Sequence, residues 1–373
     1  MIRRLKQKLF SDYRRSFLMG KRGCWAGILC LGLMLIAMTV MSSTAKAASD
    51  SIVLKYGSWM PERHVTSEQT RWWAEQVTKK TGGRVQFKFF YSQALGAAKD
   101  QPDNIKYGTF EFGPTIPSYD PAKMPLWTIT FTPWVSSVDP WVRFMALRDL
   151  AELPEMKEQL EKWDAMFLFP TAMADVYYLW TAKKPVHTLG DIKGLKLRAE
   201  GQMENSILGV GATPVAMPMP DFVEALSKGI IDGGVISTAS ALAYKLQEVC
   251  KYKSTIRLGA GGPTWIMKKS VFTKLPPDIQ KAIMEVSLDM GNFMAQMEVD
   301  VLKKADETFK KAGVNIIDFP KEDQLKLEEV AVMPVVEKWI KDQENRGFQG
   351  KKAWETFRNA TLKYEKTPHP KIP

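Results

Sequence analysis

The feature that most restricts the fold is one long helical pattern in the last third of the chain. From Pro277 to Ala312 there is no further proline and only one glycine, Gly291. Apolar residues recur at helical spacing, at Ile279, Ile283, Val286, Met290, Met294, Met297, Val301 and Ala305. About 36 residues would make a helix roughly 54 Å long, which exceeds the diameter of one small lobe. We therefore expect a single helix that spans two lobes, with two helices broken at Gly291 as the alternative.

Upstream of this helix the chain alternates strand-like and helix-like segments. Thr66-Ser67-Glu68-Gln69 is a capping box that predicts a helix through Lys80. Asp139-Pro140 and Leu153-Pro154 predict two further helix starts, and Asp191 is predicted to cap a single turn. Predicted strands span 52–56, 84–91, 110–115, 166–169, 176–181, 195–198, 230–236 and 253–258. Such alternation is typical of an α/β fold with mainly parallel sheets.

The first 47 residues predict export. A basic and polar segment over 1–24 precedes an apolar run over 25–41, and the small residues Ala45-Lys46-Ala47 follow. This order is typical of a cleaved signal peptide, and an uncleaved membrane anchor is the alternative. Arg14-Arg15-Ser16-Phe17-Leu18 also resembles a twin-arginine signal, with an ordinary Sec signal as the alternative. Either route leads out of the cytoplasm, so we expect a periplasmic protein.

The basic charge of the chain belongs mostly to this leader. The formal net charge is +11, but residues 1–47 hold nine Lys/Arg and one acidic residue. The remaining chain carries 43 Lys/Arg and 40 Asp/Glu and is nearly balanced. A basic surface is the main electrostatic sign of nucleic-acid binding, so we expect no nucleic-acid partner.

Cysteine and histidine give no sign of a metal or cofactor site. Cys24 and Cys30 lie in the leader, which leaves Cys250 without an intramolecular disulfide partner after cleavage. The three histidines of the chain are not paired at ligand spacing, so we expect neither a zinc site nor a cofactor.

Several motifs in a fixed order carry a family resemblance. The two longest are Asp191–Arg198 (DIKGLKLR) and Pro218–Gly233 (PMPDFVEALSKGIIDG), and Ser92–Gly96 (SQALG) and Tyr119–Leu126 (YDPAKMPL) support them. Together with the long helix they resemble the substrate-binding subunits of TRAP transporters, the DctP-like extracytoplasmic proteins. The similarity runs from about residue 52 to 345.

The resemblance implies an α/β fold of the periplasmic-binding-protein type (type II-like), with two lobes, hinge strands and a long helix that spans both lobes. A mature chain of about 325 residues agrees with two lobes. The expected boundaries are a signal peptide over 1–47, a first lobe over 48–178 completed by about 262–290, a second lobe over 179–261 completed by about 291–345, and a C-terminal helix and tail over 346–373. The implied function is capture of a small organic carboxylate by cleft closure in a monomer, and the implied partners are a small and a large membrane permease subunit.

Arg198 is the first candidate for the ligand contact. In TRAP binding proteins the arginine at this position forms a two-pronged salt bridge with the ligand carboxylate. A planar guanidinium matches a carboxylate with two parallel hydrogen bonds, which lysine cannot provide. The alternative is an ion pair within the lobe, with Glu200 as the partner.

Two departures from the family pattern bear on the ligand. Many relatives have an asparagine where this chain has Ile236, and a second arginine where it has Tyr178. Both changes remove polar groups that a sugar acid or a dicarboxylate would need. We therefore expect a monocarboxylate with an apolar or aromatic body, bound by Arg198 together with residues near the expected cleft: Trp59, His64, Thr115, Tyr178, Trp180, Ile236 and Trp265.

Two other classes of protein remain as alternatives. An exported hydrolase would need a nucleophile, a base and an orienting group, but the chain has no G-x-S-x-G motif, so we expect no enzyme. A sensor subunit for a membrane receptor would use the same cleft. The sequence does not distinguish sensing from transport.

Overall fold

The structure is a computed structural model that describes residues 51–132, 137, 139–171 and 177–368. The predicted signal peptide and its twin-arginine motif lie outside these residues. The helices are α2 (Val65–Lys80), α3 (Gln101–Tyr107), α4 (Pro140–Ala151), α5 (Pro154–Glu161), α6 (Met203–Gly209), α7 (Met219–Ser227), α8 (Thr238–Ala243), α9 (Lys269–Phe272), α10 (Pro277–Lys311), α11 (Lys321–Ala331), α12 (Met333–Asn345) and α13 (Gly350–Glu365).

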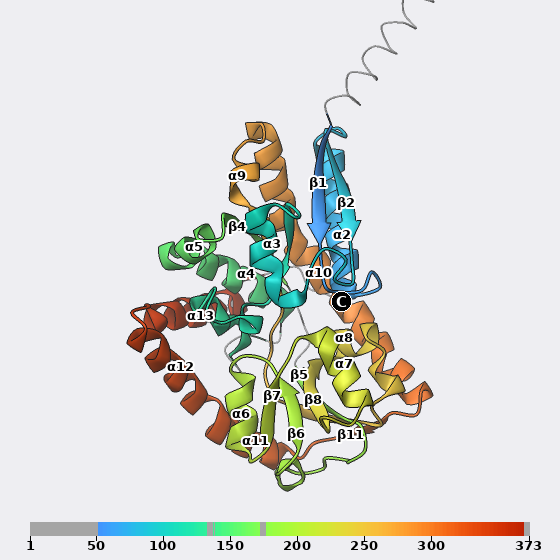
Figure 1. The fold of residues 1–373 in the computed structure, drawn as a ribbon. Helices are drawn as coiled ribbons and strands as arrows, with labels where there is room; N and C mark the ends of the chain where they lie inside the picture. The colour runs from blue at the N-terminus through green and yellow to red at the C-terminus, as the bar shows by residue number, and fades with distance from the viewer. Residues whose placement is uncertain (1–50, 133–136, 138, 172–176, 369–373) are drawn as a thin grey trace, which may run out of the picture. The chain divides into compact units, whose positions relative to one another are not determined.

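The strands form two sheets (Figure 1). The first has the order β2-β1-β3-β10-β4, and the second has the order β11-β9-β5-β8-β6-β7. We call each sheet with the helices packed on it a lobe. The strands of the first sheet are β1 (Ile52–Gly57), β2 (Val85–Phe90), β3 (Phe112–Thr115), β4 (Ala165–Pro170) and β10 (Thr264–Lys268). Those of the second are β5 (Tyr177–Thr181), β6 (Lys196–Ala199), β7 (Thr213–Ala216), β8 (Gly233–Ser237), β9 (Tyr252–Arg257) and β11 (Asn315–Ile317).

Both sheets are mixed, which corrects the expectation of mainly parallel sheets. In the first sheet β1 and β3 are parallel, but β10 runs antiparallel to both β3 and β4. In the second sheet β6 is parallel to β7 and β8, but β5 runs antiparallel to β8 and β9. Each of the two reversed strands directly follows a strand of the other sheet: β5 follows β4, and β10 follows β9. Strand β11 also follows a strand of the other sheet, β10, but it lies parallel to β9. The antiparallel pairs therefore occur at the two direct strand-to-strand crossings, and the crossing that includes α10 leads to a parallel strand.

The long helix is continuous, as the sequence predicts. Helix α10 has 35 residues and passes Gly291 without a break. It contacts α2, α4 and β4 of the first lobe, and α8 and β11 of the second. The helix therefore belongs to both lobes.

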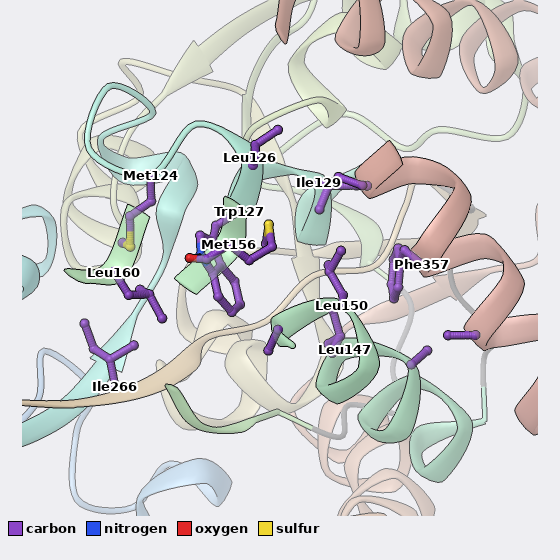
Figure 2. Packing of buried hydrophobic residues seen from close by; sticks show 14 of the residues in the cluster. Met124, Leu126, Trp127, Ile129, Leu147, Leu150, Met156, Leu160, Ile266 and Phe357 are labelled. Carbon is purple, nitrogen blue, oxygen red and sulfur yellow. The ribbon is translucent and has the colours of Figure 1, made fainter. Parts of the chain in front are cut away.

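The core of the first lobe draws on the end of the chain as well as its beginning. Figure 2 shows Leu147 and Leu150 of α4 and Met156 of α5 near Trp127, with Phe357 of α13 on the other side. Trp339 of α12 belongs to the same cluster, and its indole N–H donates to the hydroxyl of Thr128. Residues 291–345 were expected to complete the second lobe. Strand β11 pairs in that lobe, but α12 packs on the first, so the expected boundary at 345 differs from the structure.

Two local predictions need correction at helix starts. Helix α2 begins at Val65, and its N-cap is His64 rather than Thr66, because the backbone N–H of Thr66 donates to the His64 ring. The single turn at 189–192 is capped by Thr188, and Asp191 is the third residue of that turn, where its carboxylate completes a capping box. The N-cap at Asp139 is as predicted, since its carboxylate accepts from Val142 N–H.

Candidate functional site

One pocket is lined by both lobes. The first lobe contributes the loop after β1, the segment after β3 and Pro263; the second contributes the ends of β5, β6 and β8, and parts of α7 and α8. The pocket encloses about 30 Å³ of free space. This is about one water molecule's share of liquid volume, so a ligand with a ring can enter only when the walls move apart. The lining residues are Trp59, Met60, His64, Ile116, Tyr119, Tyr177, Arg198, Glu200, Met219, Ile236, Ser237, Ser240, Tyr244 and Pro263.

Arg198 reaches the pocket from β6 and is 1% exposed. Two carbonyl oxygens of its own lobe hold the guanidinium: Nε donates to Met217 O at 3.1 Å, and Nη1 donates to Val235 O at 3.3 Å. The guanidinium also lies over the ring of Phe222, with 5.8 Å to the ring centroid. These contacts fix the plane of the side chain, and the remaining nitrogen, Nη2, pairs with Glu200, which also lines the pocket. Burial lowers the pKa of Arg198, but an arginine remains charged in a protein.

Glu200 is the counter-charge of Arg198, as the alternative interpretation of the sequence expected. Its Oε1 forms an ion pair with Arg198 Nη2 and accepts from the hydroxyl of Tyr119 at 3.2 Å. The Tyr119 oxygen in turn accepts from the backbone N–H of Met219 at 3.2 Å. Since Tyr119 belongs to the first lobe and the other three to the second, this network joins the lobes. The ion pair lies in the pocket lining. Arg198 can therefore pair with Glu200 and also contact a ligand carboxylate, so the two interpretations of this residue do not exclude each other.

His64 provides a second polar link between the lobes. Its Nδ1 accepts from the backbone N–H of Thr66, and its Nε2 lies 3.2 Å from the Ser240 hydroxyl. An accepting Nδ1 assigns the proton to Nε2, so the ring is a neutral donor toward Ser240. Burial lowers the pKa of His64 to about 4, which agrees with a neutral ring. The ring also meets Tyr244 edge to face, with 6.3 Å between centroids.

The rest of the pocket is aromatic or apolar. Trp59 and Tyr119 meet edge to face at 5.8 Å between ring centroids. Tyr177 and Tyr244 add two more rings from the second lobe, and Ile236 adds an aliphatic side chain. Burial raises the pKa of both Tyr119 and Tyr244, so these phenols are neutral donors and acceptors. The arrangement offers one buried cation, one buried anion and a wall of rings.

The structure brings four of the eight predicted site residues together. Arg198, Trp59, His64 and Ile236 line the pocket, whereas Thr115, Tyr178, Trp180 and Trp265 do not.

Each of these four residues has a place elsewhere. Trp180 is fully buried in the second-lobe core, edge to face with Phe309. Trp265 is fully buried and stacks on Phe169. The ring of Tyr178 contacts the Lys253 ammonium, and Thr115 is buried within β3 opposite Thr264. Successive side chains of a strand point to opposite faces of the sheet. Tyr177 lines the pocket, so Tyr178 and Trp180, one and three residues along β5, point to the opposite face.

Sequence reasoning missed Tyr119, Tyr177, Ser240 and Tyr244 as lining residues. Tyr119 opens the motif Tyr119–Leu126 and could have been found there, because it lies just after a strand that ends at the cleft. Ser240 and Tyr244 follow β8 in the same way. Their approach to His64 depends on how the lobes meet, which no local pattern encodes.

Within the described ranges, no three or more His, Cys, Asp and Glu side chains are placed to hold a metal ion together. Likewise, none of the helices described has both the length and the apolar character needed to cross a membrane.

Comparisons with known proteins agree with this architecture. A model of the family described as "Bacterial extracellular solute-binding protein, family 7" (DctP) matches residues 56–342. A curated relative from Rhodobacter capsulatus, the C4-dicarboxylate-binding periplasmic protein DctP, is 23% identical over 288 residues, which cover 75% of this chain and 84% of the relative.

Two solved structures have the same fold. A TRAP solute-binding protein from Rhodoferax ferrireducens, in complex with copurified benzoate, matches with a TM-score of 0.76 and 24% identity over 85% of this chain and 99% of its own. A marine metagenome TRAP solute-binding protein specific for aromatic acid ligands, in complex with 3-hydroxybenzoate, matches with a TM-score of 0.74, 24% identity and the same coverage.

Proposed function

Since this chain belongs to the DctP family of bacterial extracellular solute-binding proteins, we propose that its ligand is a small monocarboxylate with an aromatic or apolar body. In this proposal the signal peptide is cleaved, the mature protein works in the periplasm, and it delivers its ligand to the small and large membrane subunits of a TRAP transporter. It binds its ligand and does not transform it. The leader sequence and the family support export and delivery.

The observation that carries the proposal is the orientation of Arg198. Two carbonyl oxygens of its own lobe anchor the guanidinium, and its Nη2 pairs with the carboxylate of Glu200, which also lines the pocket. A ligand carboxylate at this edge would gain charge-assisted hydrogen bonds in a site from which water is largely excluded.

The lining favours a ring over a second acid group. Trp59, Tyr119, Tyr177 and Tyr244 line the pocket. Among its described lining residues Arg198 is the only cation, because the His64 ring is neutral. A second ligand carboxylate would therefore be buried without a cationic partner, which is costly. The two structural neighbours described above hold aromatic acids, which supports the same class of ligand.

Calorimetric titration of the mature protein tests this proposal. The panel contains benzoate, phenylacetate, 3-methylbutanoate and succinate. We expect an aromatic acid to bind most tightly, and tighter binding of succinate than of either aromatic acid would contradict the proposal. Arg198→Lys should weaken binding by about 10- to 100-fold, because the two-pronged contact is lost. Arg257→Ala, at a half-exposed arginine outside the pocket, is the matched control.

Arg198→Ala alone leaves Glu200 buried without its counter-charge, which destabilises the fold. The double variant Arg198→Ala/Glu200→Gln removes both charges and separates the two effects. We expect it to keep a melting temperature within a few degrees of wild type and to lose carboxylate binding. If this folded variant still bound carboxylates, Arg198 would have only a structural role and would not hold the ligand.

A further inference from the structure

Glu200 presents an oxygen atom that the protein itself does not satisfy. Its side chain is 5% exposed and lines the pocket. Oε1 has the Tyr119 hydroxyl and the Arg198 ion pair, but Oε2 has no hydrogen-bond partner among the described residues. A buried carboxylate oxygen without a hydrogen-bond donor costs free energy. A donor group on the ligand could form the hydrogen bond to Oε2 that the protein does not provide.

Glu200 is also held in place from the first lobe. The Tyr119 hydroxyl donates to Oε1 and is itself positioned by Met219 N–H. The carboxylate therefore cannot turn toward solvent while these contacts persist. Its acceptor oxygen remains beside the guanidinium edge at which a ligand carboxylate would bind.

The charges in the occupied pocket also favour a hydrogen-bond donor on the ligand. When a ligand carboxylate binds Arg198, two anions share one cation inside a closed pocket, and His64 is neutral and offers no second charge. Like charges buried together are costly unless one of them gains a donor or a cation. A hydroxyl group on the ligand would supply the donor, and an ammonium group would supply both a donor and a cation.

We propose that Glu200 is a specificity-determining residue, which selects acids that carry a hydroxyl or ammonium group on the carbon next to the carboxylate. The position of the donor follows from geometry. Arg198 and Glu200 contact each other directly, so groups that bind them must also be neighbours on the ligand. The inference rests on the proposed role of Arg198 and adds a second polar contact to it.

The test uses acids that differ only at this carbon. Phenylacetate, mandelate and phenylglycine share the ring and the carboxylate and carry hydrogen, hydroxyl and ammonium, respectively. An aliphatic set with the same three groups is 3-methylbutanoate, 2-hydroxy-3-methylbutanoate and valine. Wild-type protein should bind the hydroxy or the amino acid of a set at least about tenfold more tightly than the unsubstituted acid. The tighter of the two identifies the donor.

Glu200→Gln should reduce this preference to less than about threefold, and it should keep or strengthen binding of the unsubstituted acid, because no protein carboxylate then competes for Arg198. Glu204→Gln is the matched control, since Glu204 is a nearby acid on α6 that does not line the pocket; it should keep the preference. Melting temperatures monitor folding.

The outcomes are distinguishable. Equal binding of the three acids by wild type, or an unchanged preference in Glu200→Gln, would overturn the role of Glu200 and leave the proposed function intact. Binding that survives Arg198→Lys undiminished, or no binding of any of the six acids, would overturn the proposed function and this inference with it.

Discussion

Arg198 and Glu200 are buried side by side, and the sequence located one of them more easily than the other. The motif Asp191–Arg198 places the arginine at the end of a strand, so its candidacy followed from sequence. Glu200 could be named only as a counter-charge, because its contact with Tyr119 joins residues 81 positions apart. The pocket as a whole depends on such contacts between lobes, and a local pattern does not specify them.

The buried ring of His64 predicts how the stability of the fold depends on pH. Burial lowers its pKa in the folded state to about 4, below the ordinary value of 6.5. The unfolded chain therefore binds a proton at a higher pH than the folded chain does. Stability contributed by the neutral ring is present above about pH 6.5 and is lost as the pH falls toward 4.

Between pH 7 and pH 5 we expect this residue to cost about 2 kcal/mol of unfolding free energy. Urea unfolding at both pH values measures it. In His64→Asn, asparagine can still cap α2 but does not titrate, so the loss should be smaller by about that amount. An equal loss in wild type and variant would show that His64 does not titrate between these pH values on unfolding.

At the scale of elements, the long helix was the most predictable part of the fold. Its apolar period and its lack of proline specify a helix regardless of tertiary contacts. Strands β7, β10 and β11, of 4, 5 and 3 residues, were not predicted from the sequence. Strands β7 and β11 are too short to carry a periodic pattern, and β10 is buried along most of its length, so apolar and polar residues do not alternate along it. The direction of β5 and β10 was also beyond the sequence, since it depends on where the chain crosses between sheets.

The packing of α10 against α4 explains why residue 291 is a glycine. A Cβ atom at this position would lie 2.7 Å from Cδ1 of Phe144, which is fully buried in α4. The glycine is therefore a point of close approach between two helices and not a break.

Gly291→Ala should lower the unfolding free energy. Alanine gains about 1 kcal/mol in helix propensity, but overpacking costs about 1–3 kcal/mol. Chemical denaturation measures the sum. In a Phe144→Leu background the substitution should cost less, since the ring that it meets is gone. A Gly291→Ala protein more stable than wild type would show that α10 and α4 separate easily.

At the scale of the whole molecule, function depends on how closely the lobes meet. Gly201 follows β6 of the second lobe and has φ +54°. A Cβ atom there would lie 2.5 Å from the Ser118 hydroxyl and 3.0 Å from Phe131 Cβ, both of the first lobe. The sequence indicated two lobes, but it did not identify this point of contact.

Gly201→Ala should weaken ligand binding by about tenfold, because the closed arrangement would carry a steric conflict worth on the order of 1–2 kcal/mol. Gly229→Ala is the matched control: its φ is +67°, and no atom lies within 4 Å of the added Cβ. Both variants should lose similar stability from backbone strain. Calorimetry should find weaker binding only in Gly201→Ala, and equal affinity in both variants would show that closure does not require this contact.

The central claim is that Arg198 holds the carboxylate of the ligand. A crystal structure of the mature protein with a bound aromatic monocarboxylate, such as phenylacetate, tests it most directly. We expect both carboxylate oxygens to lie about 2.7–2.9 Å from guanidinium nitrogens of Arg198, and the ring to lie among Trp59, Tyr119, Tyr177 and Tyr244. A carboxylate bound away from Arg198, with Arg198 paired only to Glu200, would contradict it.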